Sequence, residues 1–207
     1  MPNSSSNLSF PGLKRVRQLN SFFCGPAVLE MLLSFHGVEI DQSLVVEKSG
    51  VALKIKQRGM TVEELALAAE KLVPDFQFWH KRHSTLKELS LLVNEFRIPV
   101  GVEWQGIFEF EDEAEDTEMD DEDPGHYSVV TRVNLADNLV YLADPYKSYA
   151  GKDRRLTVLE FERRWWDINE TVDLKTRRRV QVDDYHMMFV VTRKEKNFPE
   201  QLKMSQG

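Results

Sequence analysis

The 207-residue chain has a single cysteine, Cys24, and no apolar run as long as the ~18 residues that a membrane-spanning helix needs. One cysteine excludes an intramolecular disulfide, which fits a reducing compartment and predicts a cytoplasmic location. With 42% hydrophobic and 29% charged residues, the composition excludes collagen-like and fully disordered proteins. The length suits one domain that buries its own core without a disulfide or a structural metal.

Basic residues are missing from one stretch, residues 109–124, where 11 of the residues are acidic. The rest of the chain has 23 acidic and 27 basic residues, so the overall net charge of −7 comes from this segment alone. Like charges at this density repel one another, which predicts a solvated acidic loop. Its position before His126 suggests a second interpretation, a charged flap that screens a cleft or attracts basic substrates. A weak Ca²⁺ site is a third, but the calcium-loop spacing is absent.

The chain has polar ends and no internal linker or repeat. Residues 1–7 and 195–207 are rich in polar residues, and we expect both to be flexible tails. Residues 8–194 then form one domain, with the acidic loop 109–124 inserted before the strand that carries His126.

Hydrophobic spacing places helices mainly in the first half of the chain and strands in the second. Ser/Thr caps and glycine stops set the helix ends. Helices are expected from Cys24 to a C-cap at Gly37, from Thr61 with Glu64 completing a capping box, from Ser84 as a cap, and over 157–166. Strands are expected over 76–81, 99–104, 126–133, 138–145 and 185–192. This order predicts an α+β fold with an antiparallel sheet rather than alternating βαβ units.

Cys24 is the residue with the clearest chemical potential. It lies at the start of a helix, where unpaired backbone N–H groups and the positive end of the dipole favour a thiolate. The same N–H groups can stabilise an oxyanion that forms when the sulfur attacks a carbonyl. Gln18 lies six residues upstream on the entering loop, where its amide group is positioned to be a second donor.

A cysteine nucleophile also needs a base, and the base needs a group that orients it. His126 opens the strand 126–133, and Asp144 closes the strand 138–145. Antiparallel pairing of these two strands brings the start of one beside the end of the other. We therefore expect the Asp144 carboxylate to lie next to the His126 imidazole.

The sequence segments around Cys24, His126 and Asp144 resemble those of a known enzyme family. QLNSFFCGPAVLEMLLSFHG is similar to the Gln-x5-Cys-Gly-Pro-Ala helix start of the C39 and C39-like cysteine peptidases, and GHYSVV and VYLADP resemble that family's His strand and Asp-Pro strand end. The resemblance covers about residues 14–193. It implies a papain-like fold in which the N-terminal helix carrying the cysteine packs on an antiparallel sheet. One departure is Phe23, where many members have Asp.

The resemblance also implies roles. Cys24 would be the nucleophile and His126 the general base and acid. Asp144 would orient His126, and Gln18 with the Cys24 N–H would form the oxyanion hole. The expected activity is peptide hydrolysis by a free-standing member, because the sequence has neither membrane helices nor a P-loop. Two alternatives stay open: an acyl transferase with the same residues, and a non-catalytic peptide-binding module.

Other candidate sites have weaker support. His80 and His83 form an H-x-x-H pair without further ligands, so no metal or other cofactor is expected. The basic run 175–179 lacks an aromatic platform, so we expect no nucleic-acid partner, and no membrane partner either. The expected partner is a peptide or protein substrate.

Overall fold

The computed structural model describes residues 9–107, 125–172, 176, 178–195, 198 and 200–207. The expected tail 1–7 and the acidic segment 109–124 lie outside these residues. Within them, no helix is long and apolar enough to cross a lipid bilayer.

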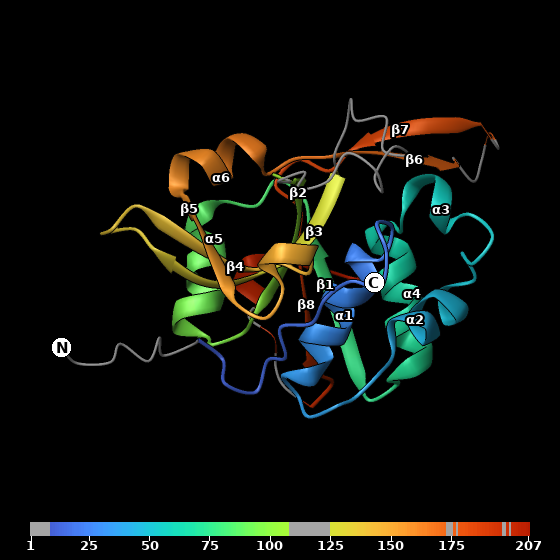
Figure 1. The fold of residues 1–207 in the computed structure, drawn as a ribbon, viewed down its shortest axis with the longest axis horizontal. Helices are drawn as coiled ribbons and strands as arrows, with labels where there is room; N and C mark the ends of the chain where they lie inside the picture. The colour runs from blue at the N-terminus through green and yellow to red at the C-terminus, as the bar shows by residue number, and fades with distance from the viewer. Residues whose placement is uncertain (1–8, 108–124, 173–175, 177, 196–197, 199) are drawn as a thin grey trace.

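A seven-stranded antiparallel sheet forms the centre of the molecule, in the order β5-β4-β3-β2-β8-β1-β9 (Figure 1). A separate two-stranded ribbon pairs β6 with β7. The strands are β1 (Phe76–Lys81), β2 (Val100–Gln105), β3 (Gly125–Asn134), β4 (Leu139–Ala143), β5 (Asp153–Thr157), β6 (Ile168–Val172), β7 (Arg179–Asp183), β8 (Met188–Arg193) and β9 (Ser205–Gln206).

Helices flank this sheet on both sides (Figure 1). The helices are α1 (Cys24–Ser34), α2 (Gln42–Ser49), α3 (Ile55–Arg58), α4 (Val62–Leu72), α5 (Leu86–Ser90) and α6 (Val158–Arg164), and a π-helical turn, Leu91–Glu95, continues α5. In Figure 1, α1 to α4 group on one side, while α5 and α6 lie on the other. The mixture of helices with an antiparallel sheet confirms the α+β class.

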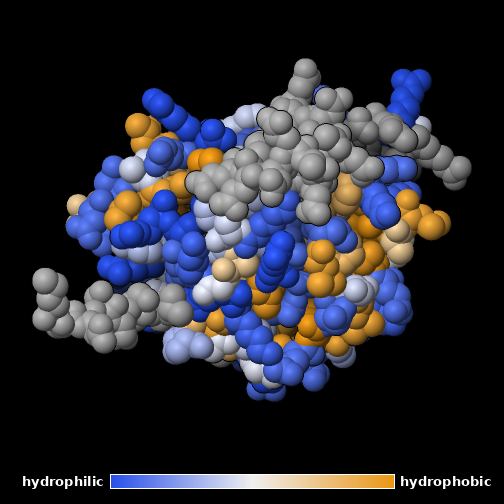
Figure 2. Space-filling model, in the orientation of Figure 1, coloured by the Kyte–Doolittle hydropathy of each residue, from blue (hydrophilic) through white to orange (hydrophobic). Residues whose placement is uncertain are grey.

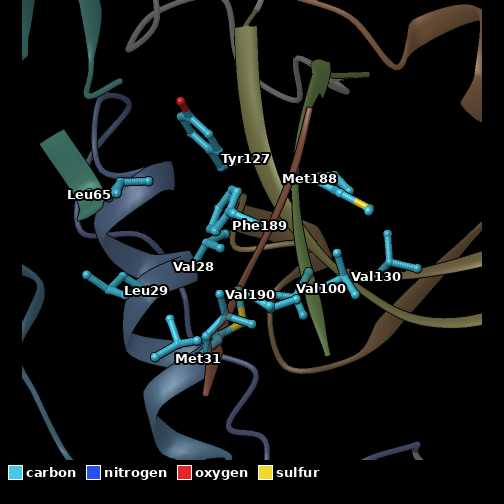
Figure 3. Packing of buried hydrophobic residues seen from close by; sticks show 14 of the residues in the cluster. Val28, Leu29, Met31, Leu65, Val100, Tyr127, Val130, Met188, Phe189 and Val190 are labelled. Carbon is cyan, nitrogen blue, oxygen red and sulfur yellow. The ribbon is translucent and has the colours of Figure 1, made fainter. Parts of the chain in front are cut away.

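A large part of the core lies between α1 and the middle of the sheet. Ten of α1's residues are buried, so the helix is enclosed on nearly every side. Figure 3 shows its Val28 and Met31 directed toward Phe189 and Val190 of β8. Both strand residues are fully or almost fully buried. Because α1 is fixed in this core, the position of its first residue, Cys24, is fixed as well.

The expected helices and strands are present, with shifted ends and several additions. Thr61 and Thr157 cap α4 and α6, each with a complete capping box. The expected cap at Ser84 is wrong: α5 begins one residue later, with Thr85 as cap and Glu88 completing the box. The sequence prediction missed α2, α3, β5, β6, β7 and β9.

The last residues differ from the flexible tail expected over 195–207. A 3-10 turn, Glu200–Leu202, precedes β9, and β9 pairs antiparallel with β1. Leu202 is buried in the core cluster, and the Gly207 N–H donates to the Phe78 carbonyl oxygen at 3.0 Å. Residues 205–207 are therefore part of the sheet's edge.

One face of the molecule is uneven in hydropathy (Figure 2). Hydrophobic residues gather on its right half, in the region of α2 and α4, while hydrophilic residues cover most of the left half. Among large apolar side chains, Leu53 is 96% exposed and Leu19 is 60% exposed.

Candidate active site

Cys24 is the first residue of α1, and no side chain caps the backbone N–H groups at this end of the helix. The N-cap residue is Phe23, whose side chain makes no capping hydrogen bond, and the first turn holds no acidic residue. By contrast, Asp41, Thr61, Thr85 and Thr157 cap α2, α4, α5 and α6 with their side chains. The first N–H groups of a helix have no acceptor within the helix. At α1 these donors stay available to a charged group that forms beside Cys24.

The β3–β4 hairpin brings His126 and Asp144 together, as the antiparallel pairing predicts. Val129 of β3 lies opposite Ala143 of β4, so the start of β3 lies beside the residue after β4. The His126 Nε2 and the Asp144 Oδ1 are 2.8 Å apart, and both side chains are buried. With Nε2 directed at Asp144, the other ring nitrogen faces away from the carboxylate. The Cys24 side chain lies close enough to the His126 ring to interact with it.

These two contacts decide the charge of the histidine. Burial alone would lower the pKa of His126, but the negative charge of Asp144, the hydrogen bond to it and the contact with Cys24 together raise the pKa to about 10. The imidazole is therefore protonated at neutral pH.

Asp144 has a donor on each carboxylate oxygen. Besides His126, its Oδ1 accepts the Tyr146 N–H at 2.9 Å, and its Oδ2 accepts from Arg154 Nη1 at 2.8 Å. Burial alone would raise the pKa of Asp144, but the His126 charge and hydrogen bond, the Tyr146 N–H and the Arg154 charge lower it below its ordinary value. The carboxylate is thus ionised and fixed in orientation.

Gln18 lies beside this group on the loop that enters α1. Its backbone N–H donates to the Pro145 carbonyl oxygen at 2.9 Å, which ties the loop to the segment after Asp144. Its Nε2 donates to the Asn20 carbonyl oxygen at 2.8 Å, and its Oε1 is buried without a hydrogen-bond partner among the described residues. The carboxamide nitrogen carries two hydrogens, so one remains for a further acceptor.

The structure thus links Cys24, His126 and Asp144 in one chain of contacts and brings Gln18 to the adjoining loop. The family model described as the Peptidase_C39 like family matches residues 11–172, which include all four residues. The chain belongs to this family.

Two solved structures are among those similar to this C39-like chain. One is the peptidase domain of Streptococcus ComA, a bi-functional ABC transporter involved in a quorum sensing pathway. It is 19% identical with a TM-score of 0.58, covering 86% of this chain and 97% of that chain. The other is a double glycine motif protease from an AMS/PCAT transporter in complex with its leader peptide. It is 14% identical with a TM-score of 0.55, covering 92% and 96%. The likeness confirms the papain-like fold. A search of curated proteins found no match.

Sequence reasoning missed two residues that support the site of this C39-like protein. Arg154 holds Asp144 from β5, a strand that the sequence prediction did not include. Gln42, the first residue of α2, is buried and bonds the backbone on both sides of Gln18. Each is distant in sequence from the residue it holds, so no local motif marks it.

The other four histidines lie apart from this chain of contacts. His36 Nε2 is 2.8 Å from the Val191 carbonyl oxygen, and His186 Nδ1 is 2.9 Å from the Ser84 carbonyl oxygen. Within the described part of the chain, no group of three His, Cys, Asp or Glu side chains is arranged to hold a metal ion.

Proposed function

We propose that the protein is a cysteine peptidase in which Cys24, His126 and Asp144 form the catalytic triad. The observation that carries the proposal is the continuous set of contacts from the Cys24 side chain through His126 to the buried Asp144 carboxylate. A nucleophile, a base and an orienting group in hydrogen-bond contact are the parts that thiol acyl chemistry requires. Membership in the C39-like family supports the same activity.

The reaction begins with Cys24 as thiolate and His126 as imidazolium. The sulfur attacks the carbonyl carbon of the scissile peptide bond and forms a tetrahedral intermediate. Its oxyanion is stabilised by the Cys24 backbone N–H at the start of α1 and by the second hydrogen of Gln18 Nε2. Because α1 has no side-chain cap, its N-terminal donors remain directed at this oxyanion.

His126 then donates its proton to the leaving amine, the C–N bond breaks, and a thioester remains on Cys24. Water, deprotonated by the now neutral His126, attacks the thioester and releases the acid, which restores the ion pair. Asp144 keeps the ring in one orientation throughout, because both of its oxygens are fixed.

A library of peptides from a denatured proteome tests this function. We expect new peptide ends with the wild-type protein and none with Cys24→Ala, and His126→Ala should reduce the rate by roughly 10⁴-fold or more. Circular dichroism and thermal unfolding of each variant check that the fold is kept. Identical cleavage by wild type and Cys24→Ala would remove Cys24 as nucleophile. Products joined to an added amine, rather than hydrolysed, would instead identify an acyl transferase with the same residues.

A further inference from the structure

A pocket adjoins the proposed catalytic residues and has no part in the steps above. Its volume is about 320 Å³, and it lies between residues 17–21, which enter α1, and Tyr146–Lys147, which follow Asp144. Gln18 is in one wall, and the other wall begins two residues after Asp144. The pocket is therefore next to the place where the scissile bond would lie.

Both walls are held in place by hydrogen bonds between segments far apart in the sequence. The Gln18 N–H donates to the Pro145 carbonyl oxygen at 2.9 Å, which joins the two walls directly. Gln42 holds the first wall from behind. Its Nε2 donates to the Arg17 carbonyl oxygen and its Oε1 accepts the Leu19 N–H, both at 3.0 Å. The pocket is formed before any substrate binds, which lowers the entropic cost of binding.

The position of the pocket assigns it to the leaving half of the substrate. In the proposed mechanism His126 donates a proton to the leaving amine, so that half of the peptide has to pass His126. The wall made by Tyr146 and Lys147 directly follows Asp144, which holds the His126 ring. A chain that continues beyond the leaving amine along this wall enters the pocket.

The charged side chains that line the pocket are all positive. Arg17 and Lys147 line it, and none of its lining residues is acidic. Arg17 is exposed, and no carboxylate of the described residues lies within salt-bridge distance of its guanidinium. Asn20 and Ser21 add neutral hydrogen-bonding groups. A guanidinium with free N–H groups binds a carboxylate through two parallel hydrogen bonds.

We propose that this pocket binds a carboxylate on the leaving half of the substrate, within the first two residues after the scissile bond. The proposal rests on the proposed peptidase function. The carboxylate is either an Asp or Glu side chain or the C-terminus of a short leaving peptide, and both present the same group to Arg17.

The test uses peptides built around one site cleaved in the proteome-derived library. In the first set, the first two positions after the cleaved bond are Glu, Gln or Lys. The C-terminus of each of these peptides is amidated and lies far from those two positions. A second set ends at those residues, with a free or an amidated C-terminus. We expect kcat/KM with wild type to be roughly tenfold or more higher for Glu than for Lys at low salt, with a smaller ratio at high salt.

Arg17→Glu should bring the Glu-to-Lys ratio below one, because the pocket then repels carboxylates. Arg163→Glu, which makes the same charge change on exposed α6, should keep the wild-type ratio. A preference only for the free C-terminus identifies the terminal carboxylate as the ligand. The pocket proposal is overturned by an equal Glu-to-Lys ratio in wild type and Arg17→Glu, or by no preference in wild type. In either case, Cys24-dependent cleavage of the Gln peptide would still support the peptidase function. Absence of any Cys24-dependent cleavage removes the peptidase function and the pocket's role together.

Discussion

Arg154 Nη1 donates a hydrogen bond of 2.8 Å to Asp144 Oδ2, the oxygen that does not face His126. The same nitrogen donates to the Ile107 carbonyl oxygen at 3.1 Å, and the guanidinium lies 3.7 Å from the centre of the Tyr149 ring. The Asp144 side chain is fully buried, and the Arg154 side chain is only 9% exposed. The pair therefore joins β5, the end of β4 and the chain after β2 around the proposed catalytic aspartate.

Replacing Arg154 tests whether it acts through Asp144. Arg154→Met keeps much of the side-chain volume but removes the charge, so the pKa of Asp144 should rise toward its ordinary value or above. We expect kcat/KM to fall by roughly 10- to 100-fold and its acid limb to move to higher pH, because Asp144 then takes up a proton more readily. Loss of one partner of a buried ion pair should also cost about 3–5 kcal/mol of unfolding free energy.

Arg154→Lys is the matched control, because it keeps the charge without the planar guanidinium. It should restore the position of the acid limb and only part of the rate. Lower activity in Arg154→Met with an unmoved acid limb would mean that Arg154 supports the fold alone.

Gln42 provides a second prediction, because it holds the peptide on both sides of Gln18. Gln42→Ala should misplace the proposed oxyanion donor and lower peptide hydrolysis by roughly 10- to 10³-fold. The rate at which iodoacetamide alkylates Cys24 should change little, because the displacement of iodide by the sulfur forms no oxyanion. Gln201→Ala, in the exposed part of the C-terminal turn, should leave both reactions unchanged. Equal losses of hydrolysis and alkylation would show that Gln42 acts on the nucleophile instead.

Local signals predicted the parts of the fold that depend on neighbours in sequence. The capping box at Thr61 predicted the start of α4, and the polar turn between two apolar runs predicted the β3–β4 hairpin. The contact between His126 and Asp144 followed from that pairing. The same rule, applied to Thr85 and Glu88 rather than Ser84, would have placed the start of α5 correctly.

The elements that were missed are stabilised by distant partners. The two residues of β9 form a strand only because they pair with β1. β5 carries Arg154 and Arg155 among its five residues, and it is a strand because β4 pairs with it. Gln42 and Arg154 belong to the site through side-chain contacts between separate elements. No spacing within one segment encodes such contacts, so the sequence predicted the candidate reacting groups but not the residues that hold them.

The charge of His126 gives a third prediction. Its folded pKa of about 10 lies above the ordinary 6.5, so the protonated form favours the folded state. That contribution to stability is complete below about pH 6.5 and is lost as the pH rises through about 10. NMR of the labelled imidazole should report a charged ring at pH 8, and unfolding by denaturant should require less free energy at pH 10 than at pH 7.

Asp144→Asn is the variant that checks the cause of this shift. It removes the carboxylate charge, so the ring should titrate at a lower pH, and peptide hydrolysis should fall by roughly 10²- to 10⁴-fold. A wild-type ring that titrates near 6.5 would contradict the ion pair.

Gly125, the residue before His126, leads to a fourth prediction. A Cβ atom there would lie 2.4 Å from Asp167 Oδ2 and 2.8 Å from Oδ1, closer than real atoms approach. Asp167 is buried and its Oδ1 accepts a hydrogen bond of 3.0 Å from Gln105 Nε2 at the end of β2. The carboxylate therefore cannot move aside without breaking a buried contact. Gly125→Ala should cost about 1–3 kcal/mol of unfolding free energy and lower activity by displacing the start of β3.

Two further variants separate this clash from a general effect of losing a glycine. Gly12→Ala should be nearly neutral, because its Cβ would meet only the Phe35 carbonyl oxygen at an ordinary 3.6 Å. In a background of Asp167→Ala, the added cost of Gly125→Ala should shrink, since the atoms that it meets are gone. Unfolding by denaturant across the four-protein cycle gives the coupling between the two positions. Equal costs in both backgrounds would mean that Asp167 does not constrain the strand that presents His126.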